Sequence, residues 1–454
     1  MTHGNNALKT DLYELTMAAG YFENKMDTLK GIFELSCHTM PPNRSYLVAC
    51  GLEQIVDYIL NLKFSKDDIA FVKTIPAFKN VHSVFFDYLK NFKFTGDLWA
   101  IPEGEIFFAA EPVIQVAAPL IEAQILETYL LSVLNIETLV ATKASRVVWA
   151  AGTNSRVIDF GSRRSHGPEA GILAARAAYI GGCAGTSNVY AGRHFGIPLY
   201  GTVAHSWIQA FEREEAAFEG YFNIFPQNTT LLIDTYDTLE AVKKIGHLKF
   251  KQEIKGVRLD SGNLKILSKK VRRKLDQEDL RQVKIIASGN LNEYKILDLV
   301  KAKAPIDIFG VGTDMATSRD YPALDLTYKL VETEDLKGAI RCKAKRSQGK
   351  TTIPGRKQIF REFTAKGRIG QDFIGSFSEI PPKNTKPVLE PVLRNGKLVK
   401  KLPSLAEIRA SFQEKLQTLP SACLNLKTTR SLHPRLTPKI LKLTKATLPV
   451  NQSH

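Results

Sequence analysis

Short apolar runs recur through the middle of the chain, each ending in a polar or glycine-containing turn that leads towards a stretch with helical spacing. They start about 23 to 42 residues apart, which is the spacing of parallel strands joined by helices. Continuous apolar strands with polar C-terminal ends are typical of a β/α barrel, whose chemistry collects at those ends. The predicted strands are Arg156–Phe160, Pro198–Val203, Thr230–Asp234, Gly256–Asp260, Lys284–Ser288 and Asp307–Val311.

The two flanks of this region follow other patterns. Residues 11–19 and 118–140 have helical spacing, whereas extended segments surround residues 31–36 and follow residue 330. A final helix is predicted for Ser404–Leu416, because Ser404 and Glu407 form a capping box. We therefore expect an N-terminal α+β domain (1–117), a β/α barrel with phosphate-binding loops (118–335), a C-terminal segment that returns to the α+β domain (336–420) and a basic, poorly ordered tail (421–454).

Length and composition indicate a globular protein. A chain of 454 residues, 44% of them hydrophobic, can bury a large core. The N-terminus shows no signal sequence, and no stretch approaches the roughly 20 apolar residues that cross a bilayer, so we predict a cytoplasmic location. The cysteines lie far apart without a Cys-x-x-Cys pair, which argues against a disulfide framework and a cysteine-based zinc site.

The formal net charge of +16 is distributed unevenly. Residues 1–250 hold 21 Lys and Arg against 26 Asp and Glu, whereas residues 251–454 hold 41 against 20. Few aromatic residues alternate with these basic side chains, as a base-stacking surface would require. A solvated basic surface is therefore the simplest interpretation, and attraction of polyanionic small molecules or weak contact with nucleic acid are the alternatives.

Polar and glycine residues gather at the predicted strand ends. The turns Ser288–Asn290 and Gly310–Thr313 close the last two predicted strands. Small residues in such turns let backbone N–H groups approach a phosphate. Alternatively, either turn is simply a tight turn that binds no ligand. Arg258 and Asp260 share one side of a strand because they lie two residues apart. They form either a structural ion pair or a site where Asp260 meets ribose hydroxyls or magnesium and Arg258 meets an anion.

Two other strand ends carry groups that suit binding or catalysis. Arginine pairs its donors with carboxylate or phosphate oxygens, so the position of Arg163 just after the strand ending at Phe160 favours binding over a solvated surface role. His205 follows another strand, beside Thr202. It is either a structural histidine or a nucleophile or proton carrier near neutral pH.

Taken together, these motifs resemble those of the nicotinate phosphoribosyltransferases, from about residue 9 to about residue 420. The resemblance implies an α/β type II phosphoribosyltransferase with an irregular β/α barrel and a second α+β domain formed by the N-terminal and C-terminal segments. It implies a homodimer whose active sites lie between subunits. The segments that carry it are Thr10–Met17, Asp159–Arg164, Gly185–Val189, Gly201–Ser206, Val257–Gly262, Ser288–Asn290 and Phe309–Thr313.

The same resemblance implies an activity and residue roles. The enzyme would form nicotinate mononucleotide and pyrophosphate from nicotinate and phosphoribosyl pyrophosphate in NAD biosynthesis. It would use coupled ATP hydrolysis, so that it is formally a ligase with glycosyl-transfer chemistry, and Mg²⁺ that is held through the substrate phosphates, with no protein ligand assigned to the ion. His205 matches the histidine that ATP phosphorylates, and Asp260 matches the acid that faces the ribose. Tyr13, supplied by the partner subunit, and Phe160 would sandwich the pyridine ring. The remaining matches are Arg163, Thr202 and Arg258 near the nicotinate carboxylate and the phosphates, and Ser288, Gly289, Gly312 and Thr313 in the phosphate cradle.

Position 187 bears on which substrate is used. The related enzymes that act on nicotinamide are similar around this position but carry an aspartate where this chain has Ser187. An aspartate accepts a hydrogen bond from an amide and repels a carboxylate, whereas a serine can donate to a carboxylate. The sequence therefore favours nicotinate. It departs from the family pattern at Cys37–Pro41, where a basic residue is usual, and at His433–Arg435.

Other activities remain as alternatives. A quinolinate or nicotinamide phosphoribosyltransferase would share the fold, but a quinolinate enzyme works without ATP and needs extra basic contacts for a second carboxylate, and the surroundings of His205 argue against it. A basic nucleic-acid-binding protein on an inactive enzyme fold is the alternative outside the class. The full set of candidate site residues argues against it, so we expect neither nucleic acid nor a membrane as a partner.

Overall fold

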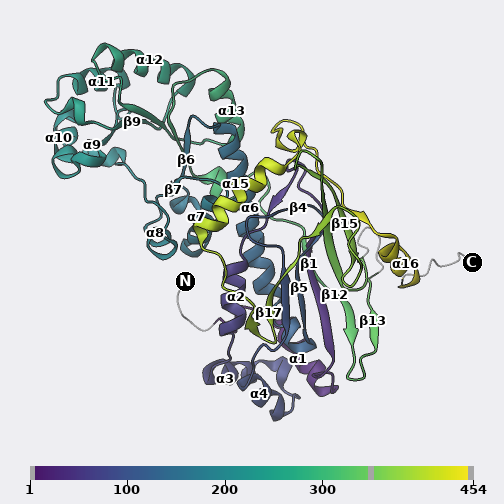
Figure 1. Cartoon of the computed structure of the whole chain (residues 1–454). Coiled ribbons are helices and arrows are strands. Elements are labelled where there is room, and N and C mark those ends of the chain that lie inside the picture. The colour runs from purple at the N-terminus through teal and green to yellow at the C-terminus, as the bar shows by residue number, and fades with distance from the viewer. Residues whose placement is uncertain (1–5, 346–351, 448–454) are drawn as a thin grey trace, which may run out of the picture. The chain divides into compact units, whose positions relative to one another are not determined.

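The computed structural model describes residues 6–345 and 352–447. The chain divides into two compact units: unit 1 comprises Met1–Leu139 and Ala323–His454, and unit 2 comprises Val140–Pro322. The colours of Figure 1 show this division, since unit 1 contains both the purple and the yellow parts of the chain and unit 2 the teal part. In sequence, unit 2 is therefore inserted between two halves of unit 1.

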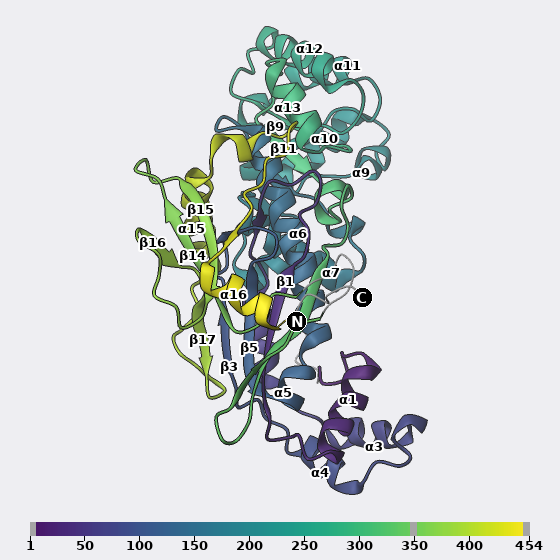
Figure 2. The same cartoon turned by 90° about the vertical axis from the view of Figure 1, so that its right-hand side faces the viewer.

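Unit 1 contains an antiparallel sheet of seven strands. The first strand of the chain lies inside this sheet, with a paired strand on each side. It is buried along most of its length, and Phe33 and Leu35 point to the same face of the sheet. Figure 2 shows the long strands β1 and β5 running together through the unit. The order is β13 (Ile340–Cys342), β12 (Leu326–Glu334), β1 (Lys30–Cys37), β5 (Pro112–Pro119), β3 (Asp97–Ala100), β17 (Glu390–Arg394) and β18 (Lys397–Leu398).

Two smaller sheets and eight helices complete the described part of unit 1. One sheet has the order β16 (Thr385–Pro387), β14 (Lys357–Phe363), β15 (Ile369–Ser376) and β19 (Arg435–Leu436), and β2 (Leu47–Val48) pairs with β4 (Ile106–Phe107). The helices are α1 (Leu12–Glu23), α2 (Leu52–Asn61), α3 (Lys66–Thr74), α4 (Ser83–Lys90), α5 (Leu120–Gln124), the first half of α6 (Glu127–Ala151), α15 (Leu405–Thr418) and α16 (Pro438–Thr447).

The C-terminal part of unit 1 confirms one prediction and corrects another. The capping box predicted at Ser404 and Glu407 is present at the start of α15. The expectation of a poorly ordered tail is wrong for residues 421–447, because β19 pairs with β15 and α16 follows it. Ile440 in α16 is fully buried, so apolar packing as well as the strand ladder fixes this segment. Residues 448–454 lie outside the described part of the chain.

Unit 2 is built on six parallel strands, which confirms the predicted β/α architecture. The order is β7 (Gly185–Thr186), β6 (Arg156–Asp159), β11 (Ile308–Val311), β10 (Lys284–Ala287), β9 (Gly256–Leu259) and β8 (Thr230–Leu232). The helices are the second half of α6, α7 (Pro168–Ile180), α8 (Val189–Phe195), α9 (His205–Gln209), α10 (Glu214–Ile224), α11 (Thr238–Gly246), α12 (Leu264–Gln277), α13 (Glu293–Lys301) and α14 (Thr313–Ala316).

One predicted strand of unit 2 is wrong. Pro198–Val203 forms only a single bridge, between Leu199 and Thr186, and the short strand β7 is the one that pairs with β6 at this edge of the sheet. Pro198 has no backbone N–H, so it can join a ladder only through its carbonyl, which accepts a hydrogen bond from the Thr186 amide at 3.0 Å. The amide of Tyr200 donates to the carbonyl of Thr186 at 2.9 Å, and the pairing of this segment ends there.

A long apolar helical stretch also departs from expectation. Leu120–Ala151, which contains α5 and α6, has the length and mean hydropathy (1.3) of a membrane span, so the prediction that no stretch approaches this composition is wrong. However, 67% of the 18-residue stretch that has this mean hydropathy is buried inside the protein. The packing of a core helix therefore accounts for its composition.

Candidate active site

Arg258 organises a cluster of polar side chains at the C-terminal edge of the unit 2 sheet. It lies in β9, nearly buried, and its Nε donates to the Oγ of Ser288 at 2.9 Å. One terminal nitrogen donates to the Oγ1 of Thr202 at 2.7 Å and to the carbonyl of Val203 at 3.0 Å, and the other donates to Asp260 Oδ1 at 2.8 Å. The guanidinium thus joins the ends of β9 and β10 to the segment that contains Thr202 and Val203.

The carboxylate of Asp260 is held in its charged form. Burial alone would raise the pKa of Asp260, but hydrogen bonds from Arg258 and Ser288, together with the charge of Arg258, hold this pKa below its usual value. Because the side chain keeps 28% of its surface exposed, a permanent negative charge faces the open end of the sheet. Such a charge can meet a cation or the hydroxyl groups of a sugar.

His205 stands beside this carboxylate at the start of α9. Its Nδ1 lies 3.1 Å from the Oγ1 of Thr235, and its Nε2 lies 3.9 Å from Asp260 Oδ2. The imidazole is 39% exposed, so a substrate can reach it. The arrangement holds one ring nitrogen against a hydroxyl group and turns the other towards the charged carboxylate.

Asp234, at the end of β8, belongs to the same cluster although no motif in the sequence pointed to it. Its Oδ2 accepts hydrogen bonds from the backbone amide of Asp260 at 2.8 Å and from Ser261 Oγ at 2.7 Å. Its Oδ1 is a buried oxygen that has no hydrogen-bond partner among the described residues. The strand-end rule could have found Asp234, because it closes a predicted strand.

The loops after β6 and β7 form a second cluster. Asp159, buried at the end of β6, accepts a hydrogen bond from the amide of Gly161 at 2.8 Å and another from Thr186 Oγ1 at 2.7 Å. Burial raises the pKa of Asp159, and these two donors partly offset the shift. Phe160 and Ser187, two of the predicted site residues, follow directly in the two loops and are half-buried.

The glycine turns come close to their neighbours, as a phosphate-binding backbone requires. Gly289 has a φ of +93°, and a Cβ at this position would lie 2.0 Å from the carbonyl oxygen of Asp260. A Cβ on Gly310 would lie 2.4 Å from the ring of Phe160. Gly312 caps the short helix that begins at Thr313. Only glycine therefore fits the first two positions without displacing a neighbour.

Arg163 and Tyr13 lie outside the hydrogen-bonded clusters that contain the other candidates. Arg163 is exposed in a 3₁₀ turn, Ser162–Arg164, just after β6. Tyr13 is 43% exposed in α1 of unit 1. Its neighbour Glu14 is buried, and desolvation raises the pKa of that carboxyl to about 7 despite hydrogen bonds from Thr10 and Thr128.

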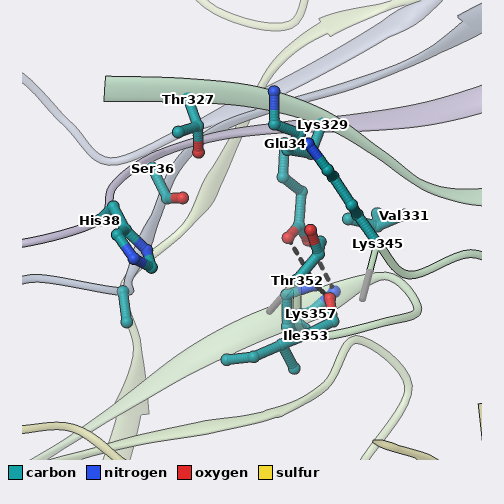
Figure 3. Close-up of a pocket in the computed structure, with 11 residues that line it drawn as sticks. Glu34, Ser36, His38, Thr327, Lys329, Val331, Lys345, Thr352, Ile353 and Lys357 are labelled. Carbon is teal, nitrogen blue, oxygen red and sulfur yellow. Dashed lines mark hydrogen bonds and ion pairs between the residues drawn. The ribbon is translucent and has the colours of Figure 1, made fainter. Parts of the chain in front are cut away.

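Unit 1 contains a cavity of about 200 Å³ on one face of its large sheet (Figure 3). Residues at alternate positions of β1 and β12 line it, because side chains two apart point to the same face. Glu34 and Lys357 form an ion pair at 2.6 Å within it, and Lys329 and Lys345 add further positive charge. The cavity therefore favours an anion.

Three family models together cover most of the chain. They describe the N-terminal domain of nicotinate phosphoribosyltransferase (residues 8–135), the nicotinate phosphoribosyltransferase family (residues 155–362) and the C-terminal domain of nicotinate phosphoribosyltransferase (residues 377–444). The chain belongs to the nicotinate phosphoribosyltransferase family.

Relatives and solved structures of the nicotinate phosphoribosyltransferase family match nearly the whole chain. The nicotinate phosphoribosyltransferase pncB2 of Mycobacterium tuberculosis is 41% identical over 436 residues, covering 94% of this chain and 90% of that protein. The Bacillus subtilis nicotinate phosphoribosyltransferase is 38% identical over 380 residues, covering 82% and 76%. The crystal structure of human nicotinic acid phosphoribosyltransferase has a TM-score of 0.84 at 26% identity, covering 97% of this chain and 100% of that one.

The structure gathers the predicted residues of this family member into groups. Hydrogen bonds join Thr202, Arg258, Asp260 and Ser288, with His205 at their side. A structure of nicotinate-nucleotide pyrophosphorylase from Pyrococcus furiosus shares the fold with a TM-score of 0.74 at 26% identity, covering 92% of this chain and 98% of that one. Sequence reasoning missed the residues that support the groups, which are Asp159, Thr186, Asp234 and Thr235.

Proposed function

We propose that this protein is a nicotinate phosphoribosyltransferase, which forms nicotinate mononucleotide and pyrophosphate in the salvage of nicotinate for NAD. The observation that carries the proposal is the cluster of His205, Arg258 and Asp260 at the strand ends of a chain that belongs to this family. The similarity to the M. tuberculosis enzyme over nearly the full length of both chains supports it.

The transfer itself needs positioning and charge more than a strong nucleophile. When pyrophosphate leaves C1 of the ribose, the sugar gains oxocarbenium character, and the pyridine nitrogen attacks in line. Asp260 would hold the ribose, and its ionised carboxylate favours the developing positive charge. Arg258 keeps Asp260 ionised and oriented, because its guanidinium donates a hydrogen bond to the carboxylate. Its other N–H groups donate to Ser288 and Thr202, which hold the guanidinium in place.

Magnesium and ATP would enter at the same strand ends. Mg²⁺ prefers carboxylate and phosphate oxygens, and the charged Asp260 together with the buried, unpartnered Oδ1 of Asp234 provides suitable oxygens beside a bound substrate. The ion supplies charge stabilisation for the departing pyrophosphate. His205 would accept the γ-phosphoryl group of ATP, and this phosphorylation would couple ATP hydrolysis to product formation.

The loops after β6 and β7 would bind the pyridine substrate. Phe160 offers a ring face for stacking, and Ser187 can donate to the carboxylate of nicotinate, which an aspartate would repel. Arg163, like its neighbour Arg164, is exposed just after Phe160, and its guanidinium can pair with a carboxylate. Gly289 and Gly312 would let the backbone approach the phosphates of phosphoribosyl pyrophosphate.

We also propose a homodimer with shared active sites, in which Tyr13 of one subunit stacks on the pyridine ring bound by the other. The exposed ring of Tyr13 supports this role.

The lysine-lined cavity of unit 1 suits an anion, and both phosphoribosyl pyrophosphate and ATP are polyanions.

The deciding experiment measures mononucleotide formation from phosphoribosyl pyrophosphate with nicotinate, nicotinamide or quinolinate, each with and without ATP. Wild type and His205→Ala are compared. We expect turnover of nicotinate alone, stimulated by ATP in the wild type and unaffected by ATP in the variant.

Other results would point elsewhere. Turnover of nicotinamide would contradict the role given to Ser187, and turnover of quinolinate with release of carbon dioxide would favour the alternative enzyme of the same fold. Stimulation by ATP that survives in His205→Ala would remove His205 from the coupling step. No turnover of any of the three would refute the proposed function.

A further inference from the structure

Asp159 is a buried carboxylate that bridges two loops of the site. It is 1% exposed, and among the described residues its two oxygens accept from the Gly161 amide in the loop after β6 and from the hydroxyl of Thr186, where β7 ends and the second loop begins. Burying a carboxylate is costly unless hydrogen bonds compensate. The two hydrogen bonds compensate this cost only while both donors stay in place, so the carboxylate couples the positions of the two loops.

Thr186 extends the bridge into the loop that carries Ser187. Its hydroxyl donates to Asp159 Oδ2 at 2.7 Å and accepts from the backbone amide of Asn188 at 3.0 Å. The amide of Ser187 in turn donates to the backbone carbonyl of Asp159 at 2.9 Å. The turn through Ser187 is therefore held from both sides by residues of β6 and β7.

The bridge also fixes the position of Phe160. Asp159 and Thr186 are direct partners in the parallel ladder, so Phe160 and Ser187 leave the sheet at matching positions. The hydrogen bond from the Gly161 amide closes the turn behind Phe160, whose ring packs against Gly310 so closely that a Cβ there would lie 2.4 Å from it. The aromatic ring and the backbone that carries the Ser187 hydroxyl thus have a set separation.

We infer that Asp159 and Thr186 are positioning residues that determine recognition of the pyridine substrate, by holding the ring face of Phe160 and the hydroxyl of Ser187 at the separation a pyridine carboxylate requires. This inference rests on the proposed function, because it takes Phe160 and Ser187 as the pyridine contacts. Neither Asp159 nor Thr186 touches the substrate in this scheme. Their loss therefore weakens binding of nicotinate without disabling the transfer of the phosphoribosyl group.

The test compares Thr186→Val, which removes the hydroxyl at nearly constant shape, with Thr186→Ser, which keeps it. For Thr186→Val we expect the KM for nicotinate to rise roughly tenfold, the change that corresponds to one lost hydrogen bond of about 1.4 kcal/mol. The KM for phosphoribosyl pyrophosphate and kcat should change less than about twofold, and Thr186→Ser should resemble the wild type.

Asp159→Asn provides a second variant if Thr186→Val does not fold, because an amide keeps the shape but cannot accept from both loops. Ser155→Ala is the matched control: it removes a hydrogen bond of 2.9 Å to the carbonyl of Ile306 at the opposite end of β6. We expect this control to lower the melting temperature slightly and to leave the KM for nicotinate unchanged.

Two results would overturn the inference. One is an unchanged KM for nicotinate in folded Thr186→Val or Asp159→Asn. The other is a parallel rise of the KM for both substrates, which indicates a general structural role. Failure of the proposed function is separate, since it would appear as a wild type that forms no nicotinate mononucleotide.

Discussion

At the scale of single residues, the contact between His205 and Thr235 orients the imidazole ring. Nδ1 lies within hydrogen-bond distance of the Thr235 hydroxyl, whereas the nearest carboxylate oxygen lies 3.9 Å from Nε2, too far for a hydrogen bond. The Thr235 hydroxyl can pair with Nδ1 in either tautomer, because a hydroxyl group both donates and accepts. With Nδ1 held in this way, Nε2 is the ring nitrogen that faces Asp260.

This contact predicts a selective effect of Thr235→Val. The variant loses the hydroxyl that orients the ring, so we expect phosphorylation of His205 by ATP to slow by roughly tenfold, while turnover without ATP changes less than about twofold. Phosphoenzyme formation with labelled ATP and nicotinate turnover with and without ATP measure the two effects. Thr235→Ser serves as the control and should behave like the wild type; equal ATP stimulation in Thr235→Val would contradict the role of the hydroxyl.

A second residue-scale prediction concerns Glu14, whose pKa burial raises to about 7 from its usual 4.5. The folded protein binds a proton here that the unfolded chain has lost, so this group's contribution to stability is present below about pH 4.5 and is lost as pH rises through 7. Glu14→Gln removes the titration while it keeps the hydrogen-bonding shape. We expect the variant to gain stability relative to wild type between pH 5.5 and pH 8 in urea unfolding; a difference independent of pH would contradict this.

At the scale of elements, the loop after β10 depends on Gly289. An alanine there meets two penalties: the positive φ of +93° and a backbone oxygen 2.0 Å from the new Cβ. We expect Gly289→Ala to displace the loop from Asp260 and to lower kcat/KM for phosphoribosyl pyrophosphate by more than about tenfold, because the backbone would no longer fit a phosphate.

The matched control is Gly152→Ala in the same unit. Gly152 has a φ of +70°, but no atom lies within 4 Å of an added Cβ. Both alanine variants should lose about 1 kcal/mol of stability from the backbone conformation, and only Gly289→Ala should lose activity. Similar activity in the two variants would show that the close approach to Asp260 has no functional consequence.

Elements with a continuous apolar core could be predicted from the sequence, and elements defined by non-local pairing could not. The runs that became β6 and β8 to β11 are apolar enough to be buried in a parallel sheet whatever surrounds them. In contrast, β7 has only two residues, and it exists because Thr186 pairs with both β6 and Leu199. Two residues are too few to give a local pattern, whereas the apolar run of Pro198–Val203 has one and still forms only a bridge.

The candidate site divides in the same way. Arg258, Asp260 and the glycine turns stand out because the strand-end rule needs only local sequence. The bridge from Asp159 to Thr186 spans 27 residues, and the contact of His205 with Thr235 spans 30, so neither follows from spacing along the chain. Supporting residues such as Thr186 and Thr235 can be identified only from the three-dimensional structure, because their partners are distant in sequence.

At the scale of the whole molecule, the proposed shared site makes a prediction about mixed subunits. Tyr13 lies in unit 1 and His205 in unit 2, so a dimer of Tyr13→Ala and His205→Ala chains would keep one intact site if each site takes Tyr13 from the partner. Random mixing should then restore about one quarter of the ATP-stimulated activity of the wild type, which neither variant should show alone. No recovery, with mixed dimers demonstrated by two affinity tags, would contradict the shared site.

The insertion of unit 2 between the halves of unit 1 also constrains how the chain is made. As the ribosome releases the nascent chain, β1 can pair with β5 early, but its other neighbour, β12, emerges only after all of unit 2. At usual elongation rates this delay is on the order of tens of seconds. During that time one edge of a largely apolar strand lacks its partner, which makes the half-made protein a substrate for chaperones and prone to aggregate.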